Sequence, residues 1–118
     1  MEKYSQSEIQ KIENSYSVLV STLKQNMNEE QLDFIDKAYA LTLEKYDGKR
    51  TMSGKPYMLH LIELAEIAVL EMGLRSKSVV AAFLHGIVYK ADVTIDYIRE
   101  MFGEPTVRIV DGFDKISS

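Results

Sequence analysis

Two histidines are the residues of this chain most suited to chemistry. They are the only histidines in the sequence, His60 and His85, and each lies within an apolar stretch. A neutral imidazole is the commonest metal ligand in proteins and also serves as a general acid or base near neutral pH. The spacing leaves a second interpretation open, in which each histidine is a buried side chain with one backbone hydrogen-bond partner.

A short basic stretch is the second feature with chemical potential. Lys45, Lys49, Arg50 and Lys55 surround a single acid, Asp47, although the whole chain has a formal net charge of -4. Such a cluster predicts either a local anion site or a solvated basic loop. The overall negative charge disfavours nucleic acid as a partner, because binding to it depends on an excess of lysine and arginine.

Length and composition predict one globular domain. At 118 residues with 46% hydrophobic side chains, the chain is long enough to bury a single core. The absence of cysteine excludes disulfides and a catalytic thiol. The sequence lacks the apolar run of a signal peptide and any stretch of about 18 apolar residues. We therefore expect a cytoplasmic protein with no membrane partner.

Apolar residues recur every three or four positions, which predicts an all-α fold of five to six helices. Ser7 with Gln10, and Asn28 with Gln31, have the spacing of capping boxes that begin the first two helices. The first helix should end near residue 25 and form an N-terminal unit of residues 1–27, and the second should end near residue 48. A third helix over about 57–71 is apolar over much of its circumference, which predicts a central position.

The remaining helices are shorter. A very apolar helix is expected over about 79–89, capped by Ser76 or Ser78, after Gly73 ends the third helix. Thr94 caps the next one, which ends near residue 103. Pro105 opens a last helix, and a glycine at position 112 is expected to interrupt it.

Four segments of the chain, in order, resemble the motifs of one family. They are S-G-K-P-Y-M-L-H at 53–60, A-A-F-L-H-G-I-V at 81–88, D-V-T at 92–94 before a helix ending in F-G, and I-V-D-G-F-D-K-I-S at 109–117. The family has S-G-E-P-Y-(hydrophobic)-x-H-P, A-A-(hydrophobic)-L-H-D-V-V and V-x-D-G-V-T-K-L-S. On these residues, the chain resembles the N-terminal HD domain of the bifunctional (p)ppGpp synthetase/hydrolases, the RelA/SpoT homologues.

The resemblance implies a fold and a metal site. The fold is an HD-domain-like helical bundle over residues 28–118, from which the family's C-terminal helices are absent. In active members, manganese activates a water that removes pyrophosphate from the 3′ position of guanosine tetra- or pentaphosphate. Of the family's ligands, His60 and His85 are kept. The histidine of the H-x-G-Q segment falls at Tyr46, the aspartate of the His-Asp pair falls at Gly86, and a fourth ligand lies beyond Ser118.

Other active-site positions differ as well. The family's Glu-Asp pair, which assists the attacking water, falls at Tyr89 and Lys90. An ammonium repels a divalent cation and cannot accept a proton as a carboxylate does. The Arg-Lys pair that contacts guanine falls at Thr51 and Met52, which leaves Ser53 as the match in that stretch.

Two hypotheses of function follow from the metal site. In the first, the chain is a degenerate, non-catalytic HD domain of a stringent-response protein. It then has a structural or regulatory role beside a synthetase domain or another copy of itself, with no cofactor. In the second, the chain is a (p)ppGpp 3′-pyrophosphohydrolase or another nucleotide phosphohydrolase. His60 and His85 then bind manganese together with Asp47, Asp92 or Tyr46.

A third hypothesis is a metal-free binding module. Lys49, Arg50 and Lys90, with Ser53, would hold a guanine nucleotide or another anion. The alternative explanation of Lys90 is a solvated cation, which the helix dipole favours near a C-terminus.

Because the family's C-terminal helices are absent, we expect the last helix to expose Val107, Val110 and Phe113. An exposed apolar face of this kind predicts self-association.

Overall fold

The computed structural model describes residues 3–72 and 76–117, which contain helices and one isolated antiparallel bridge between Arg50 and Pro56. The predicted all-α class is therefore confirmed. The helices are α1 (Gln6–Leu23), α2 (Glu29–Lys45), α3 (Tyr57–Met72), α4 (Ser76–Leu84), α5 (Ile87–Lys90), α6 (Ile95–Phe102) and α7 (Glu104–Ser117).

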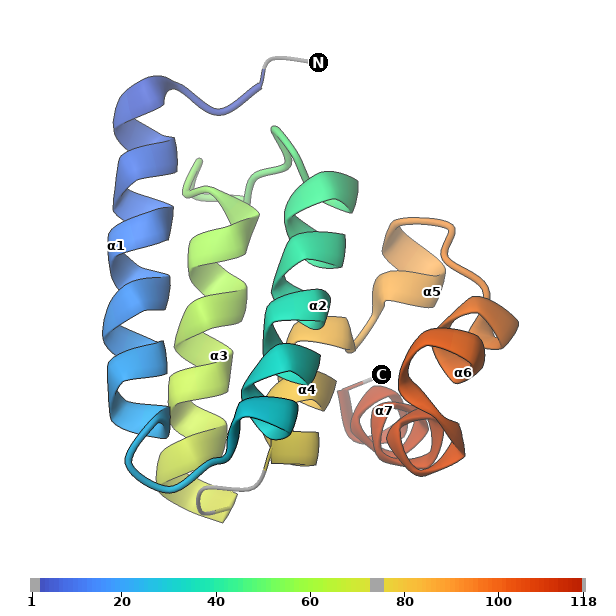
Figure 1. Ribbon diagram of the computed structural model, residues 1–118. Helices are drawn as coiled ribbons and strands as arrows, with labels where there is room; N and C mark the ends of the chain where they lie inside the picture. The colour runs from blue at the N-terminus through green and yellow to red at the C-terminus, as the bar shows by residue number, and fades with distance from the viewer. Residues whose placement is uncertain (1–2, 73–75, 118) are drawn as a thin grey trace.

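Helix α4 lies at the centre of the bundle. It packs against α2, α3 and α7, while α1 packs on α3 and α6 packs on α7. Figure 1 shows α1, α3 and α2 side by side, with α4 behind them and α5 to α7 at one side. Every residue from Ser78 to Leu84 is buried, as expected for a helix that is apolar on all sides.

The predicted central position of α3 is confirmed for one side of the helix only. This helix lies between α1 and α4, and its outer side leaves Ile67 52% exposed and Leu70 83% exposed. The helix has more apolar side chains than its neighbouring helices can cover. The end that we predicted for it at Gly73 lies outside the described residues.

The helix starts follow capping rules, with one correction. Asn28 and Gln31 form the predicted capping box, with reciprocal hydrogen bonds of 2.9 and 3.0 Å. Helix α1 uses Ser5 and Glu8 instead of Ser7 and Gln10. This start places the Glu8 carboxylate in the first turn, where it faces the positive end of the helix dipole and accepts a stronger hydrogen bond than an amide does.

The predicted helix over 79–89 is divided in two. Helix α4 ends at Leu84, and the short α5 begins after Gly86, whose φ of +75° lies in the left-handed region that glycine adopts without steric cost. The apolar pattern continues across this break, so periodicity does not reveal it. Thr94 caps α6 as predicted. Helix α7 runs through Gly112 without the predicted interruption, because one glycine costs a helix only about 1 kcal/mol.

The last helix does not expose the predicted apolar face. Val107 is 6% exposed and Val110 is 0% exposed, because α7 packs against both α4 and α6. The side chain of Phe113 lies outside the described residues. Val107 and Val110 are therefore not available as a surface for self-association. Self-association itself stays a prediction.

The segment before α1 is tied to the loop that follows α2. The buried Tyr4 hydroxyl donates to the main-chain oxygens of Tyr46 and Lys49 at 2.8 and 2.7 Å. Arg50 of the same loop forms a two-pronged ion pair with Glu8 of α1. The predicted N-terminal unit is thus joined to the loop that carries half of the candidate site.

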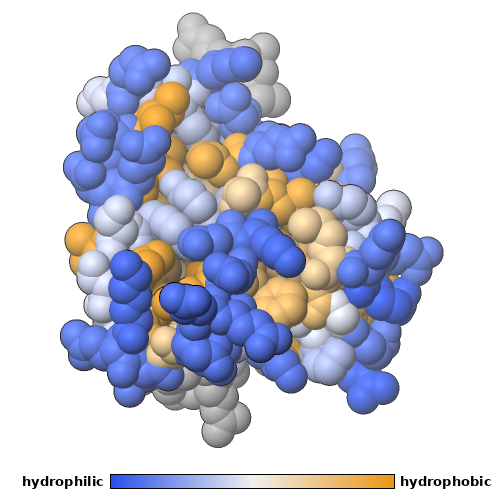
Figure 2. Space-filling view, in the orientation of Figure 1, coloured by the Kyte–Doolittle hydropathy of each residue, from blue (hydrophilic) through white to orange (hydrophobic). Residues whose placement is uncertain are grey.

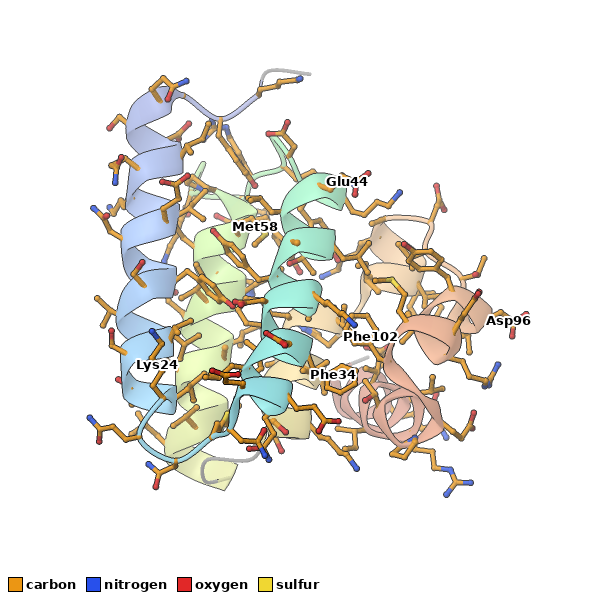
Figure 3. The ribbon with its side chains drawn as sticks, viewed as in Figure 1. Lys24, Phe34, Glu44, Met58, Asp96 and Phe102 are labelled. Atoms are coloured by element: carbon orange, nitrogen blue, oxygen red, sulfur yellow. The ribbon has the colours of Figure 1, made fainter. Side chains whose placement is uncertain are left out.

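Aromatic packing joins α2 to the helices at the side of the bundle. Phe34 of α2 and Phe102 of α6 point toward one another in Figure 3, with ring centroids 6.5 Å apart. In Figure 2, hydrophobic side chains show between hydrophilic ones on this face. None of the helices in the described ranges combines the length and the apolar character needed to cross a membrane.

Matched substitutions on α3 test this packing. Leu61 is 0% exposed, whereas Leu70 is 83% exposed. We expect Leu61→Ala to lower the free energy of unfolding by about 3 kcal/mol, because the loss of apolar transfer and the new cavity both destabilise the fold. Leu70→Ala should change it by less than about 0.5 kcal/mol. Urea denaturation measures both, and equal losses would contradict the described burial.

Candidate functional site

The loop between α2 and α3 brings two tyrosines together. Tyr46 ends α2 and is 1% exposed, and its ring centroid lies 4.7 Å from that of Tyr57, the first residue of α3. The Tyr46 hydroxyl is buried and has no hydrogen-bond partner among the residues that the structure describes. Burial, then the neighbouring Tyr57 and Asp114, raise the pKa of Tyr46. This phenol therefore stays protonated and cannot serve as an anionic ligand at the position of the family's first histidine.

The two histidines lie on packed helices next to this pair. His60 on α3 lies against Tyr57, with ring centroids 5.4 Å apart. Burial chiefly lowers the pKa of His60, and the charges of His85 and Lys90 lower it further. His85 follows the end of α4, and its Nδ1 lies 3.0 Å from the main-chain oxygen of Ala82. A single backbone partner is what the second interpretation of the histidines predicts for His85.

Lys90 lies across the glycine that replaces the family's aspartate. A Cβ atom built on Gly86 would lie 3.6 Å from Cδ and Cε of Lys90 and 3.8 Å from its Nζ. The Lys90 ammonium donates to the Tyr57 hydroxyl at 2.9 Å and lies 5.1 Å from the centre of that ring. The side chain is thus directed back over Gly86 while remaining exposed, and the interpretation of Lys90 as a solvated cation at a helix end stays open.

A second lysine meets Lys90 from the loop. The Lys49 ammonium donates to the main-chain oxygen of Lys90 at 2.7 Å, so Lys49 is the cation that caps the C-terminal end of α5. It also lies 5.6 Å from the centre of the Tyr46 ring. The structure therefore brings together Lys49 and Lys90, two of the predicted anion-binding residues.

The other predicted anion-binding residues lie elsewhere. Arg50 faces α1, where its guanidinium pairs with Glu8, so its position serves the fold. Ser53 lines a groove of about 790 Å³ between α1, α3 and the loop, which neither histidine lines. Its hydroxyl lies 3.0 Å from that of Thr51, and Met52 extends fully into solvent.

The described residues do not assemble a metal site. Among residues 3–72 and 76–117, no three His, Cys, Asp or Glu side chains are placed to hold one ion. Asp47 and Asp92, which we considered as replacement ligands, are exposed, and Asp92 lines a hollow near Tyr97 that contains neither histidine. Tyr89, at the position of the family's glutamate, is 81% exposed.

One residue of the site was missed by sequence reasoning. Asp114 of α7 accepts a hydrogen bond from the Gly86 main-chain N–H at 2.7 Å. It thereby secures the break between α4 and α5 from the opposite side of the site. The signal was present in the sequence, because position 114 carries aspartate where the family motif V-x-D-G-V-T-K-L-S has threonine.

Comparison with known proteins decides the family. Residues 38–118, which include both histidines and most of the bundle, match the family described as HD domain. The chain belongs to the HD-domain family. This membership fits the helical architecture, in which His60 lies on α3 and His85 lies just after α4.

Several curated proteins are similar to this HD domain. It is 33% identical over 82 residues to a guanosine-3′,5′-bis(diphosphate) 3′-pyrophosphohydrolase of Aquifex aeolicus, a match that covers 70% of the chain. It is 33% identical over 96 residues to a GTP pyrophosphokinase of Myxococcus xanthus, covering 81% of the chain. It is 28% identical over 88 residues, or 75% of the chain, to the bifunctional (p)ppGpp synthase/hydrolase SpoT of Escherichia coli. Each match spans only 12% of the relative's own length.

The contact between Asp114 and Gly86 can be tested on α7. Asp114→Ala leaves the Gly86 N–H without its acceptor, and we expect the free energy of unfolding to fall by about 1–3 kcal/mol. Asp114→Asn keeps an oxygen acceptor and should recover most of that loss. Asp111→Ala is the matched control, because it removes only a surface pair with Lys115, worth about 0–1 kcal/mol. Equal losses in urea denaturation for the two alanine variants would contradict the role of Asp114.

The ion pair between Arg50 and Glu8 predicts a pH dependence. The hydrogen bond from Arg50, and then that from Ser5, lower the pKa of Glu8 from 4.5 to about 2. Because the folded chain holds this proton more weakly than the unfolded chain, Glu8 contributes stability above about pH 4.5 that is lost as the pH falls toward 2. Glu8→Gln should reduce the fall in unfolding free energy over that window. Glu13→Gln, on the same helix but outside the pair, should leave the pH profile unchanged.

Proposed function

We propose that this chain is a non-catalytic HD domain of the (p)ppGpp synthetase/hydrolase type, with a structural or regulatory role. The observation that carries the proposal is the position of Lys90. Its side chain lies over Gly86, at the place where the family has the aspartate of its His-Asp pair. A fixed positive charge there opposes the binding of a divalent cation.

The donor atoms around this position do not fit manganese. Two neutral imidazoles alone, those of His60 and His85, are a weak site for manganese, which favours oxygen donors. The Asp114 carboxylate accepts from the Gly86 N–H, and the Tyr46 phenol is protonated and buried. The domain therefore lacks the means to lower the pKa of a bound water, which is what a catalytic metal supplies in hydrolysis.

The relatives suggest where such a domain acts. Their names describe a (p)ppGpp synthase, a GTP pyrophosphokinase and a guanosine bis(diphosphate) pyrophosphohydrolase, and all of them are much longer than this chain. A domain without its own hydrolysis would act on such an assembly through contacts. Its partner in this proposal is a synthetase domain or a second copy of the chain.

Metal content and turnover test the proposal together. Protein soaked in manganese and desalted should contain far less than one ion per chain by mass spectrometry. It should release no pyrophosphate from guanosine tetraphosphate above the rate without protein. Stoichiometric manganese with turnover would overturn the proposal and would assign ligands besides His60 and His85.

Paired substitutions give the same test a positive control. Gly86→Asp combined with Lys90→Ala restores a carboxylate next to His85 and removes the opposing ammonium. We expect manganese to raise the melting temperature of this double variant and to leave the parent chain unchanged. Gly86→Asp alone is the matched control, because Lys90 would pair with the new carboxylate and keep manganese from stabilising the fold. A manganese response in the parent chain would contradict the role given to Lys90.

A further inference from the structure

We propose that Lys49 and Lys90 form a metal-free binding site for a phosphate or diphosphate group. The inference rests on the proposed function, because a divalent cation beside Gly86 and the Lys90 ammonium lying over it exclude one another. It goes beyond that function by assigning a ligand to the same place. The two lysines come from separate elements, the loop after α2 and the end of α5, and meet only in the folded chain.

Both ammonium groups lack an acidic partner within the described residues. Lys49 donates to a main-chain oxygen and Lys90 to a tyrosine hydroxyl, and neither takes part in an ion pair. Each ammonium has three donors, so each keeps donors available to a ligand. Two positive charges from separate elements, each with donors to spare, favour an anion near Gly86.

Aromatic rings hold the two ammonium groups in place. Lys49 lies over Tyr46 at 5.6 Å and Lys90 over Tyr57 at 5.1 Å, measured to the ring centres. The two rings are in contact, with centroids 4.7 Å apart. Because cation–π contacts favour one position of an otherwise mobile lysine, less conformational freedom is lost when a ligand binds. This arrangement differs from that of solvated lysines on an open surface.

The nearby carboxylates are already engaged. Glu63 pairs with Lys55, and Asp114 accepts from the main-chain N–H of Gly86. Glu63 is thus neutralised by Lys55, whereas Asp114 keeps its negative charge, so the two lysines outnumber this one carboxylate that approaches from α7.

The donor chemistry selects the class of ligand. Lysine presents a compact charge without the planar fork that matches a carboxylate, and it is a frequent binder of phosphate. Two such charges on neighbouring rings suit the several oxygen atoms and the multiple negative charge of a phosphate or diphosphate. The group could belong to a nucleotide or to free pyrophosphate, and the two sources share this chemistry.

Calorimetric titration with sodium pyrophosphate tests the site directly. The experiment uses the full chain in EDTA, so that no metal contributes. We expect saturable binding that Lys49→Gln and Lys90→Gln each weaken about tenfold or more, because each removes a charge-assisted hydrogen bond. Lys37→Gln is the matched control, since Lys37 also lies over an aromatic ring, 5.3 Å from the centre of Phe34, but on another part of α2. It should leave binding unchanged.

The outcomes separate this inference from the proposed function. Absence of pyrophosphate binding, or equal binding by the parent chain and both lysine variants, would overturn the site. Manganese binding with turnover would instead overturn the non-catalytic role. Melting curves confirm that each variant is folded. Guanosine diphosphate and adenosine diphosphate, titrated in parallel, identify the source: tighter binding of one nucleotide than of pyrophosphate assigns a nucleotide, and equal binding assigns the diphosphate group alone.

Discussion

The burial of α4 is the constraint on which the rest of the structure depends. From Ser78 to Leu84 this helix has no exposed side, so α2, α3 and α7 must each cover part of it. Covering α4 brings the ends of three helices to one place, where His85 leaves the buried helix. The position of the candidate site is therefore a consequence of how the core is closed.

The break after α4 gives this site its particular character. Gly86 adopts a left-handed conformation, which turns the chain into α5 and adds no side chain after His85. The space above it is taken by the aliphatic part of Lys90, while Asp114 secures the backbone from α7. The carboxylate nearest the break thus comes from α7, and a positive charge lies over Gly86. These changes fit together as one arrangement rather than as independent losses.

The helical periodicity of the sequence was sufficient to predict most of the fold. The all-α class, the capping boxes at Asn28 and the cap at Thr94 follow from local hydrogen bonding and apolar spacing, which depend on residues within one or two turns. The division at Gly86 and the central position of α4 were missed. Apolar residues continue through the break, and a nearly uniform apolar pattern cannot distinguish a helix covered on two sides from one covered on all sides.

The candidate site, too, was predicted in part from the sequence and in part only from the structure. The sequence by itself determined which residue types are available to the site, among them His60 and His85 with Tyr46, Gly86 and Lys90. Only the tertiary structure decided where the long side chains go. Arg50 reaches Glu8 across 42 positions, and Asp114 reaches Gly86 across 28. Lysine, arginine and aspartate side chains have many rotamers of similar energy, so the partners that the fold brings near them select among these. Residue type fixes the chemistry that is available, and packing between distant segments fixes which of it can act together.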